Sequence, residues 1–482
     1  MHTDRRNFIK TGVFAAGIMG LGSLVGANAT AFHKISRTFY LDSEKGDDSQ
    51  TGQSSATAWK TIQRLKQEKL VPGDTVLFRR GGLWRESLKP VSGEPQRPVI
   101  YDAYGEGEKP VLQCSTERNF TCDWRLCDKN LWETADAEPI QGAREPLTVD
   151  VGNIIFDHGK SVGFKRWELT DLKESGDFMY DAEKKRVVAY FDKNPAELYR
   201  SIELCLKRHV IDQSGVHDCV IRNLTLRYSA AHGVAGSGAK RVVMEDCDIC
   251  FIGGGHHTYN NQPCRFGNGI EWWNEAEDCL VQRCRLWEIY DVAFSPQGDK
   301  GDQTIKNITI RDCTIWNCEQ SFEYWRTGDG AVTENVVFEH NTCVDAGYGW
   351  SHRQRPDERG THFLSYMVTA KTDIILRNNI FCRGSNDLIY MYSDWRSGMQ
   401  LHNNLWWQPD GAVFLTFRGS GVFKAEEFSK YLNEYGIEKN SILAEPRFVD
   451  PMKRDYRLAP GSPGWQTAAD GGLVGSRENR KS

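Results

Sequence analysis

The sequence predicts an all-β solenoid, a tube built from short strands that stack coil upon coil. Two observations lead to this fold class. Seven strand-like segments between residues 219 and 406 share one pattern, and they recur every 30 residues on average, with no helical pattern between them. The composition agrees, since the 482-residue chain has 45 Gly and 11% aromatic residues, as a turn-rich β protein would. With 39% hydrophobic and 26% charged residues, disorder is not expected.

Each of the seven segments reads as two short strands joined by a tight corner. Positions one, three, six and eight carry no charge, whereas position four is polar or charged. Strands alternate with period two, so the spacing of two, three, two marks one extra residue that turns the chain. Hairpins in a sandwich would not explain why this residue recurs seven times. The segments are 219–226, 242–249, 279–286, 308–315, 336–343, 374–381 and 399–406.

The corner at position six holds asparagine in the last three segments. Asn341, Asn379 and Asn404 are expected to tolerate a left-handed backbone and to hydrogen-bond their stacked neighbours.

This repeat, with the motifs at 39–42, 59–62 and 72–76 and the closing motifs at 446–450 and 458–463, resembles the pectate-lyase-like superfamily. The resemblance implies a right-handed parallel β-helix and a secreted carbohydrate-active protein. It identifies the fold better than the chemistry, because one fold hosts many functions.

The chain then divides into five parts. Residues 1–29 are a signal peptide, and 30–115 form an N-terminal cap with a capping helix and the first coils. The pattern lapses over 116–205, which we interpret as an irregular antiparallel β insertion. Residues 206–420 are the regular coils, and 421–482 contribute a helix over the open end and a final coil.

The N-terminus resembles a twin-arginine export signal. Arg5 and Arg6 precede a Gly-rich apolar stretch over 11–26, and Ala27 and Ala29 offer a small-residue cleavage site. The alternative is a frayed N-terminal helix. The signal predicts a mature protein that begins near Thr30 and works in the periplasm or outside the cell.

The cysteines are expected to be packing residues. Six of the 14 fall on inward positions, and side chains stacked side by side are poorly placed for a disulfide. These six are Cys219, Cys247, Cys279, Cys284, Cys313 and Cys343.

Candidate catalytic residues lie on a third strand of each coil, predicted at 270–273, 292–295, 322–325, 363–366 and 388–391. If Ile270, Val292, Phe322 and Leu388 point inward, the alternate residues face outward. Those outward residues are Glu271, Trp273, Asp291, Ala293, Ser295, Glu323 and Trp325.

Acids beside indoles suit a sugar groove, because acids move protons and indole faces stack on sugar rings. Glu271 and Glu323 are expected two coils apart, about 9.6 Å, with Ala293 between them. An inverting glycosidase separates its carboxyls by about 6.5–9.5 Å. Asp291 could pair with either glutamate. The alternative is that all three acids are solvated residues of the repeat.

Two long loops flank this face and supply candidate substrate-binding residues. Adjacent histidines in the first loop could bind sugar or move protons, and cations in the second could clamp a uronate or sulfate. Solvated loop residues and a surface salt-bridge cluster are the alternatives. The loop candidates are His256, His257, His352 and Arg353, and two further candidates are Arg326, just past Trp325, and Tyr366 on the predicted strand 363–366.

Three functions fit these residues. The leading one is a glycoside hydrolase that uses a pair of the three acids on a polysaccharide. The second is a polysaccharide lyase, which would need a uronate neutralised by Ca²⁺ or by Arg and Lys side chains. The third is a non-catalytic glycan binder. The hydrolase needs no cofactor or metal. The net charge of −5 predicts no nucleic-acid partner, no segment after the signal predicts a membrane partner, and a monomer is expected.

Overall fold

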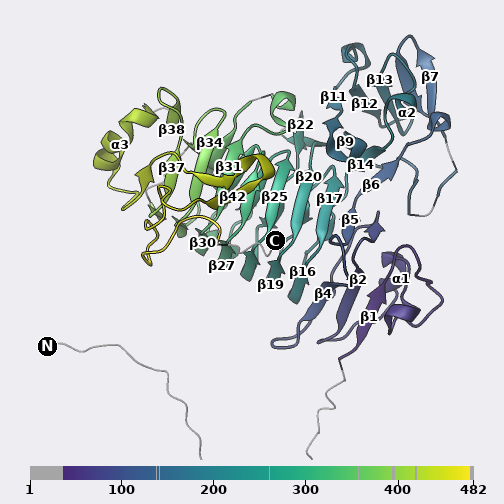
Figure 1. Cartoon of the computed structure of the whole chain (residues 1–482), viewed down its shortest axis with the longest axis horizontal. Coiled ribbons are helices and arrows are strands. Elements are labelled where there is room, and N and C mark those ends of the chain that lie inside the picture. The colour runs from purple at the N-terminus through teal and green to yellow at the C-terminus, as the bar shows by residue number, and fades with distance from the viewer. Residues whose placement is uncertain are drawn as a thin grey trace, which may run out of the picture. The chain divides into compact units, whose positions relative to one another are not determined.

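The computed structural model describes residues 36–136, 138–140, 142–259, 261–356, 358–392, 397–417 and 421–477. The predicted signal peptide lies outside the described residues. The rest of the chain folds as a parallel β-helix, as the repeat predicted, with three sheets that run along its length (Figure 1).

Sheet A holds the first strand of each predicted segment and is parallel throughout. Its ten strands in spatial order are β1 (Thr38–Leu41), β2 (Thr75–Arg79), β4 (Val99–Tyr104), β16 (His217–Arg222), β19 (Ala239–Glu245), β24 (Ala276–Gln282), β27 (Thr304–Arg311), β30 (Val332–Glu339), β33 (Ile374–Arg377) and β36 (Met399–His402).

Sheet B follows each corner. Its main path is β10 (Ser161–Val162), β9 (Val151–Phe156), β14 (Ile202–Leu206), β17 (Thr225–Ser229), β20 (Asp248–Ile252), β25 (Arg285–Ile289), β28 (Thr314–Trp316), β31 (Thr342–Ala346), β34 (Ile380–Gly384), β37 (Leu405–Trp407) and β40 (Ile442–Leu443). Three further strands join it, namely β3 (Leu83–Trp84), β5 (Val111–Gln113) and β6 (Ser115–Glu117).

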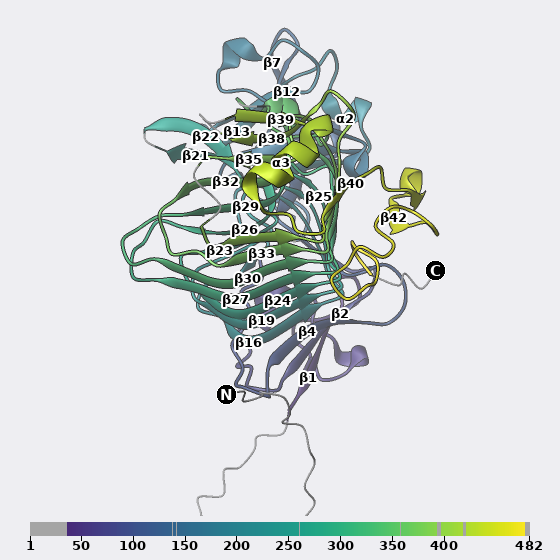
Figure 2. The ribbon, with the colours of Figure 1, turned by 90° about the vertical axis from the view of Figure 1, so that its left-hand side faces the viewer.

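Sheet C contains the predicted third strands. It runs β15 (Ile211–Asp212), β18 (Val234–Ala235), β23 (Ile270–Trp273), β26 (Val292–Gly298), β29 (Gln320–Arg326), β32 (Thr361–Val368), β35 (Ile389–Met391), β38 (Val413–Phe417) and β39 (Gly421–Lys424). Figure 2 shows the strands of sheets A and C lying side by side in coil order.

The skipped residue of the repeat turns the chain by adopting a left-handed conformation. Position five has φ between 52° and 59° in all seven segments. The seven residues are Asn223, Asp246, Arg283, Asp312, His340, Asn378 and Asn403. The expectation that Asn341, Asn379 and Asn404 occupy this conformation was therefore wrong by one residue.

These three asparagines instead form a buried hydrogen-bonded ladder, as their stacking predicted. The Asn341 backbone N–H donates to Asn379 Oδ1 at 2.9 Å, and the Asn379 backbone N–H donates to Asn404 Oδ1 at 3.0 Å. Each side-chain amide also donates to a carbonyl of the preceding coil. The ladder satisfies polar groups that the core could not otherwise solvate.

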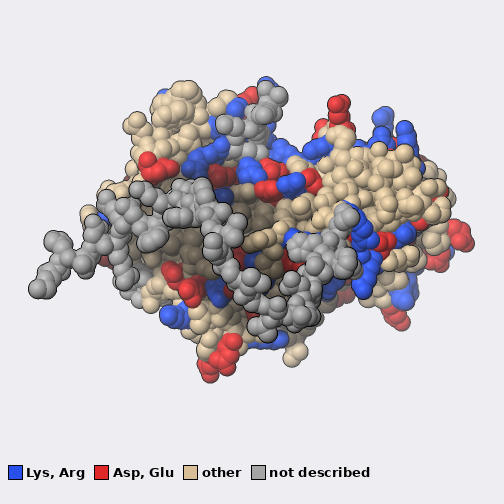
Figure 3. Space-filling view, turned by 90° about the horizontal axis from the view of Figure 1, so that it is seen from below, with Lys and Arg blue, Asp and Glu red and all other residues tan. Residues whose placement is uncertain are grey.

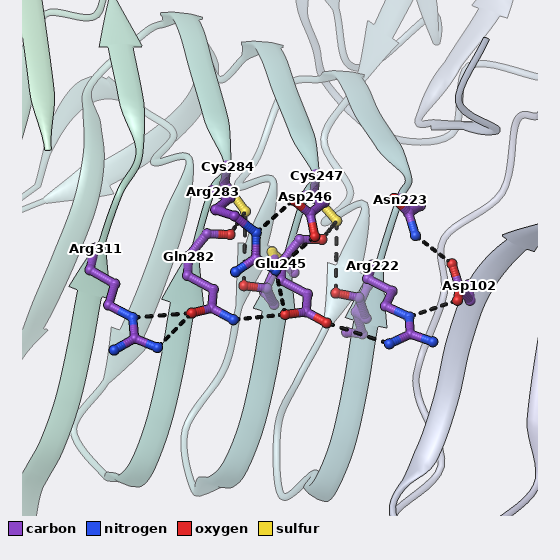
Figure 4. A network of polar contacts seen from close by, with 12 residues as sticks. Asp102, Arg222, Asn223, Glu245, Asp246, Cys247, Gln282, Arg283, Cys284 and Arg311 are labelled. Carbon is purple, nitrogen blue, oxygen red and sulfur yellow. Dashed lines mark hydrogen bonds and ion pairs between the residues drawn. The ribbon is translucent and has the colours of Figure 1, made fainter. Parts of the chain in front are cut away.

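Position four lies on the outer face of sheet A and carries a polar ladder (Figure 4). Arg222 binds Asp102 and Glu245, Glu245 accepts from Gln282, and Gln282 accepts from Arg311. Figure 3 shows that blue and red side chains also lie close together on other parts of the surface.

The inward positions form one long core. All residues at positions one, three, six and eight are at most 5% exposed, including the six predicted packing cysteines. All 14 cysteines lie within the described residues, and the six predicted packing cysteines are buried free thiols, as expected. The stacked Cys247 and Cys284 thiols each donate to backbone carbonyls.

Both ends of the tube are covered. At the start, α1 (Ile62–Leu65), capped by the Thr61 hydroxyl, buries Ile62 and Leu65. At the other end, β39 pairs antiparallel with β38, and α3 (Phe428–Tyr435) packs Phe428 and Tyr431 on Phe414 (Figure 2). The predicted terminal helix therefore covers the exposed coil edge.

The predicted insertion contains a five-stranded, mainly antiparallel sheet. Its order is β11 (Phe164–Lys165), β12 (Asp177–Asp181), β13 (Arg186–Tyr190), β8 (Leu131–Thr134) and β7 (Trp124–Asp128), with α2 (Pro195–Leu198) nearby in the chain. The insertion also contributes β9, which pairs antiparallel with β14 within sheet B. Two hairpin strands, β21 (Gly255–Tyr259) and β22 (Gln262–Phe266), and the terminal pair β41 (Phe448–Asp450) and β42 (Asp455–Leu458), complete the fold.

None of the helices in the described parts of the chain is long and apolar enough to span a bilayer.

Candidate active site

The outward residues of sheet C form two neighbouring columns. In the first column, Glu271 pairs with Ser295. Ser295 is in turn in register with Glu323, because Phe294 pairs with Phe322 and Gln297 with Trp325. In the second column, Trp273 pairs with Gln297 and Gln297 with Trp325. The two glutamates thus stand two strands apart, about 9.6 Å along the sheet, as predicted.

The residue between the glutamates is not the one expected. Ser295 lies there, while Ala293 is fully buried and belongs to the core. Phe294 rather than Val292 continues the inward column of Ile270 and Phe322, so the predicted register of this strand was two residues off. The error arose because either Val292 or Phe294 satisfies the same alternation.

Glu271 is buried and held by amide and imidazole groups. Its Oε2 accepts from Asn268 Nδ2 at 2.9 Å and from Gln297 Nε2, and His232 Nε2 lies 3.5 Å away. Burial raises the pKa of Glu271 to about 7, and the two amides oppose part of that rise. A carboxyl with such a pKa can exchange a proton near neutral pH.

Glu323 is 5% exposed and has the more strongly perturbed carboxyl. Burial raises its pKa to about 8, the charge of Asp291 adds to the rise, and a hydrogen bond with Tyr366 opposes it. Burial and the neighbouring Glu323 raise the pKa of the Tyr366 phenol well above its usual value, so the hydroxyl stays protonated and acts as the donor. Glu323 therefore favours its protonated form.

Asp291 reaches the site through an ion pair rather than from the glutamate column. It lies four residues before Ser295, and Arg355 Nη1 donates to its Oδ1 at 2.8 Å. Arg355 follows the short helical turn His352–Gln354 and also lies 3.7 Å from the buried Glu319. Asp291 is thus an anion whose charge acts on Glu323.

His352 belongs to the same cluster. Its Nδ1 lies 3.1 Å from Glu319 Oε1, and this hydrogen bond raises the pKa of His352. The predicted cationic loop therefore supplies His352 and Arg355 to the site, whereas Arg353 is exposed.

An aromatic row lines the second column. Trp273 and Trp325 pack edge to face at 5.6 Å, Trp325 stacks on Tyr366 at 6.0 Å, and Tyr366 contacts Tyr392 at 5.7 Å. Trp273, Trp325 and Tyr366 are half-buried, so part of each ring faces solvent. This row gives a surface on which a sugar ring can stack.

Three other predicted binding residues have different outcomes. His257 is exposed on the β21–β22 hairpin and contacts Phe266, while the half-buried His256 packs against Trp167. Arg326 is fully buried and donates to Asn274 and to the Gln303 carbonyl. It cannot meet a ligand on the outer face of sheet C, because alternation along β29 turns it inward once Glu323 and Trp325 point outward.

Sequence reasoning missed several residues of the site. Gln297 was excluded because the strand was expected to end before Pro296, yet β26 continues to Gly298. Asn268 and His232 come from loops, and no local pattern marks their approach to Glu271. Arg355 stood in the predicted cationic loop without a role assigned to it.

Among the residues that the structure describes, no group of three or more His, Cys, Asp or Glu side chains could hold a metal ion. A cavity of about 880 Å³ lies elsewhere, between the first coils and the insertion, and neither glutamate lines it.

Comparison with known proteins finds only distant similarity in the matches described here. No protein-family model matches it. An 82-residue stretch, 16% of this chain, is 32% identical to a lacto-N-biosidase of Bifidobacterium longum subsp. longum, and it spans only 5% of that protein's length.

Two solved structures resemble the chain over most of its length. XylC in complex with xylose has a TM-score of 0.47 and 11% identity, covering 84% of this chain and 82% of that one. Pectate lyase Pel9A has a TM-score of 0.45 and 12% identity, covering 92% and 93%. The XylC structure contains xylose, and Pel9A is a pectate lyase by name.

Proposed function

We propose that this protein is a glycoside hydrolase that cleaves a polysaccharide in the groove over sheet C. The observation that carries the proposal is the pair of buried glutamates, Glu271 and Glu323, whose pKa values are raised to about 7 and about 8 beside an aromatic row. Two carboxyls with unequal proton affinity are what acid–base cleavage of a glycosidic bond requires.

The surroundings of each glutamate favour different roles. Glu323 faces the anionic Asp291, so it keeps its proton and is the proposed general acid for the leaving oxygen. Glu271 accepts from Asn268 and Gln297, which stabilise its carboxylate, and it is the proposed general base for a water molecule. A separation near 9.6 Å along the sheet is at the upper end for an inverting pair.

Asp291 is the alternative partner of Glu323. Its ion pair with Arg355 holds an anion close enough to affect Glu323, and its charge acts on Glu323 more strongly than that of Glu271 does. In that arrangement, Glu271 would bind substrate rather than activate water.

The test is a panel of plant, algal and host glycans incubated with the purified protein, with products analysed by mass. Hydrolysis adds one water for every bond cleaved, and the E323Q variant should give far less product than wild type in the same time. Unsaturated products without added water would establish a lyase. Unchanged glycan size with retention of the protein on the polymer would establish a binder.

We also propose that the protein is exported from the cytoplasm to reach its substrate. Arg5 and Arg6 support a twin-arginine signal, which would carry the folded protein with free thiols out of the cytoplasm. Replacing both arginines by lysine should leave the protein in the cytoplasmic fraction, and unchanged export would contradict this assignment.

A further inference from the structure

Two histidines stand behind Glu271 that the proposed chemistry does not use. His209 lies between β14 and β15, and His232 lies between β17 and β18. Their rings stack at 5.2 Å with an interplanar angle of 20°, and His232 is 8% exposed. They come from consecutive coils and reach the site only through the fold.

The hydrogen bonds around the two rings determine where their protons lie. The Asn268 backbone N–H donates to His232 Nδ1 at 2.8 Å, and the His232 backbone N–H donates to His209 Nδ1 at 3.3 Å. A ring nitrogen that accepts a hydrogen bond carries no proton, so each neutral ring carries its proton on Nε2. The Nε2–H of His232 then faces Glu271 Oε2 at 3.5 Å.

Burial disfavours an imidazolium in this pair, although the nearby carboxylates favour one. Burial lowers the pKa of both histidines to about 4. Asp291 and His257 act on His232, while Glu271, Asp212 and Lys207 act on His209. Phe266 covers the His232 ring at 5.0 Å. Protonation of either ring at Nδ1 would also break a hydrogen bond, because each Nδ1 accepts from a backbone N–H.

We propose that His232, supported by His209, is a positioning residue that presents a permanently neutral donor to Oε2 of Glu271. This inference rests on the proposed function. Every polar contact recorded for the Glu271 carboxyl within the described residues is to Oε2. The neutral donor therefore orients Oε1 for water or substrate, without the fixed ion pair that Arg355 imposes on Asp291.

Two variants of His232 separate positioning from packing. His232→Asn keeps an oxygen where Nδ1 accepts from Asn268, but it is too short to reach Glu271. His232→Gln places an amide near the position of Nε2 and can still donate to Glu271. H232N should lower kcat about 10- to 100-fold with KM within about twofold, because the general base is misplaced.

The pH dependence of kcat distinguishes positioning from packing, because a purely structural role of His232 would leave it unchanged. Loss of a donor to the carboxylate should shift the acidic limb of kcat to higher pH in H232N, while H232Q should keep the limb in place and retain activity within about threefold. Equal losses in both variants with an unmoved acidic limb would overturn the proposal.

A second measurement needs no substrate. Nitrogen NMR of the histidine rings, assigned with H232N and His209→Asn, should show both residues as neutral Nε2–H tautomers from pH 5 to pH 8. A ring that titrates in this interval, or an Nδ1–H tautomer, would overturn the proposal. If E271Q keeps full activity, the catalytic role of Glu271 fails instead, while the NMR result still decides the state of the histidines.

Discussion

The outer faces of sheets A and C both carry glutamates, but the pKa of these glutamates is shifted in opposite directions on the two sheets. On sheet A, Glu245 is half-buried, yet Gln282 and Arg283 bind it at 2.7 Å and lower its pKa against the effect of burial (Figure 4). On sheet C, the ion pairs recorded for the described residues include no Lys or Arg partner for Glu271 or Glu323, and burial raises the pKa of both.

This difference in charge pairing shows how the same β-helix can use acids for stability on one sheet and for proton transfer on another. A stacked coil places side chains about 4.8 Å apart, so alternating charges make a ladder, whereas acids without counter-charges become proton donors and acceptors. The aromatic row of Trp273, Trp325 and Tyr366 lies beside the acids on sheet C, and Tyr366 hydrogen-bonds Glu323. The ladder on sheet A is open to solvent and contributes little per pair.

The largest expected effect is on catalysis. E323Q should lower kcat/KM about 10²- to 10⁴-fold, because the amide cannot donate a proton to the leaving group. The matched variant on the other face, E245Q, should leave kcat/KM within about twofold. Rates measured on the glycan found in the panel check both variants, and equal activity of E323Q and wild type would remove the proposed distinction between the two faces.

A smaller effect is expected from the aromatic row. W325A should raise KM about 3- to 10-fold with a modest change in kcat, because the indole offers a stacking surface and no reacting group. Trp287 provides a matched control, since it stacks on Trp316 at 4.8 Å over sheet B, away from the groove. If W287A raises KM as much as W325A, the row is not a substrate platform.

A third expected effect is on stability and depends on pH. Because the pKa of Glu323 is raised from 4.5 to about 8, the folded state holds a proton that the unfolded chain releases above about pH 4.5. The free energy of unfolding should therefore fall as pH rises from about 5 to 8.

E323Q removes this slope and should stabilise the protein at pH 8 by about 1–3 kcal/mol relative to wild type. E245Q should behave oppositely. It removes a carboxylate whose lowered pKa contributes stability above about pH 4.5, and should destabilise the protein slightly at pH 8. Denaturant unfolding at pH 5 and pH 8 measures both slopes, and parallel curves for wild type and E323Q would contradict the buried, protonated state of Glu323.

Much of the fold was determined by the sequence alone, because the inward pattern is local. Each segment specifies its own corner, so the apolar positions, the charged position four and the outward glutamates could all be located without coordinates. The strand alternation that placed Glu271 and Glu323 on one face depends only on residues within a few positions of each.

The tertiary structure decided what those glutamates contact. The loops between coils vary in length, so the register of β26, and with it the exchange of Ala293 for Ser295, could not be derived from a local pattern. The same holds for Gln297, His232 and Arg355, which approach the acids from other coils. Burial also depends on these long-range contacts, and burial is the main cause of the raised pKa values at Glu271 and Glu323.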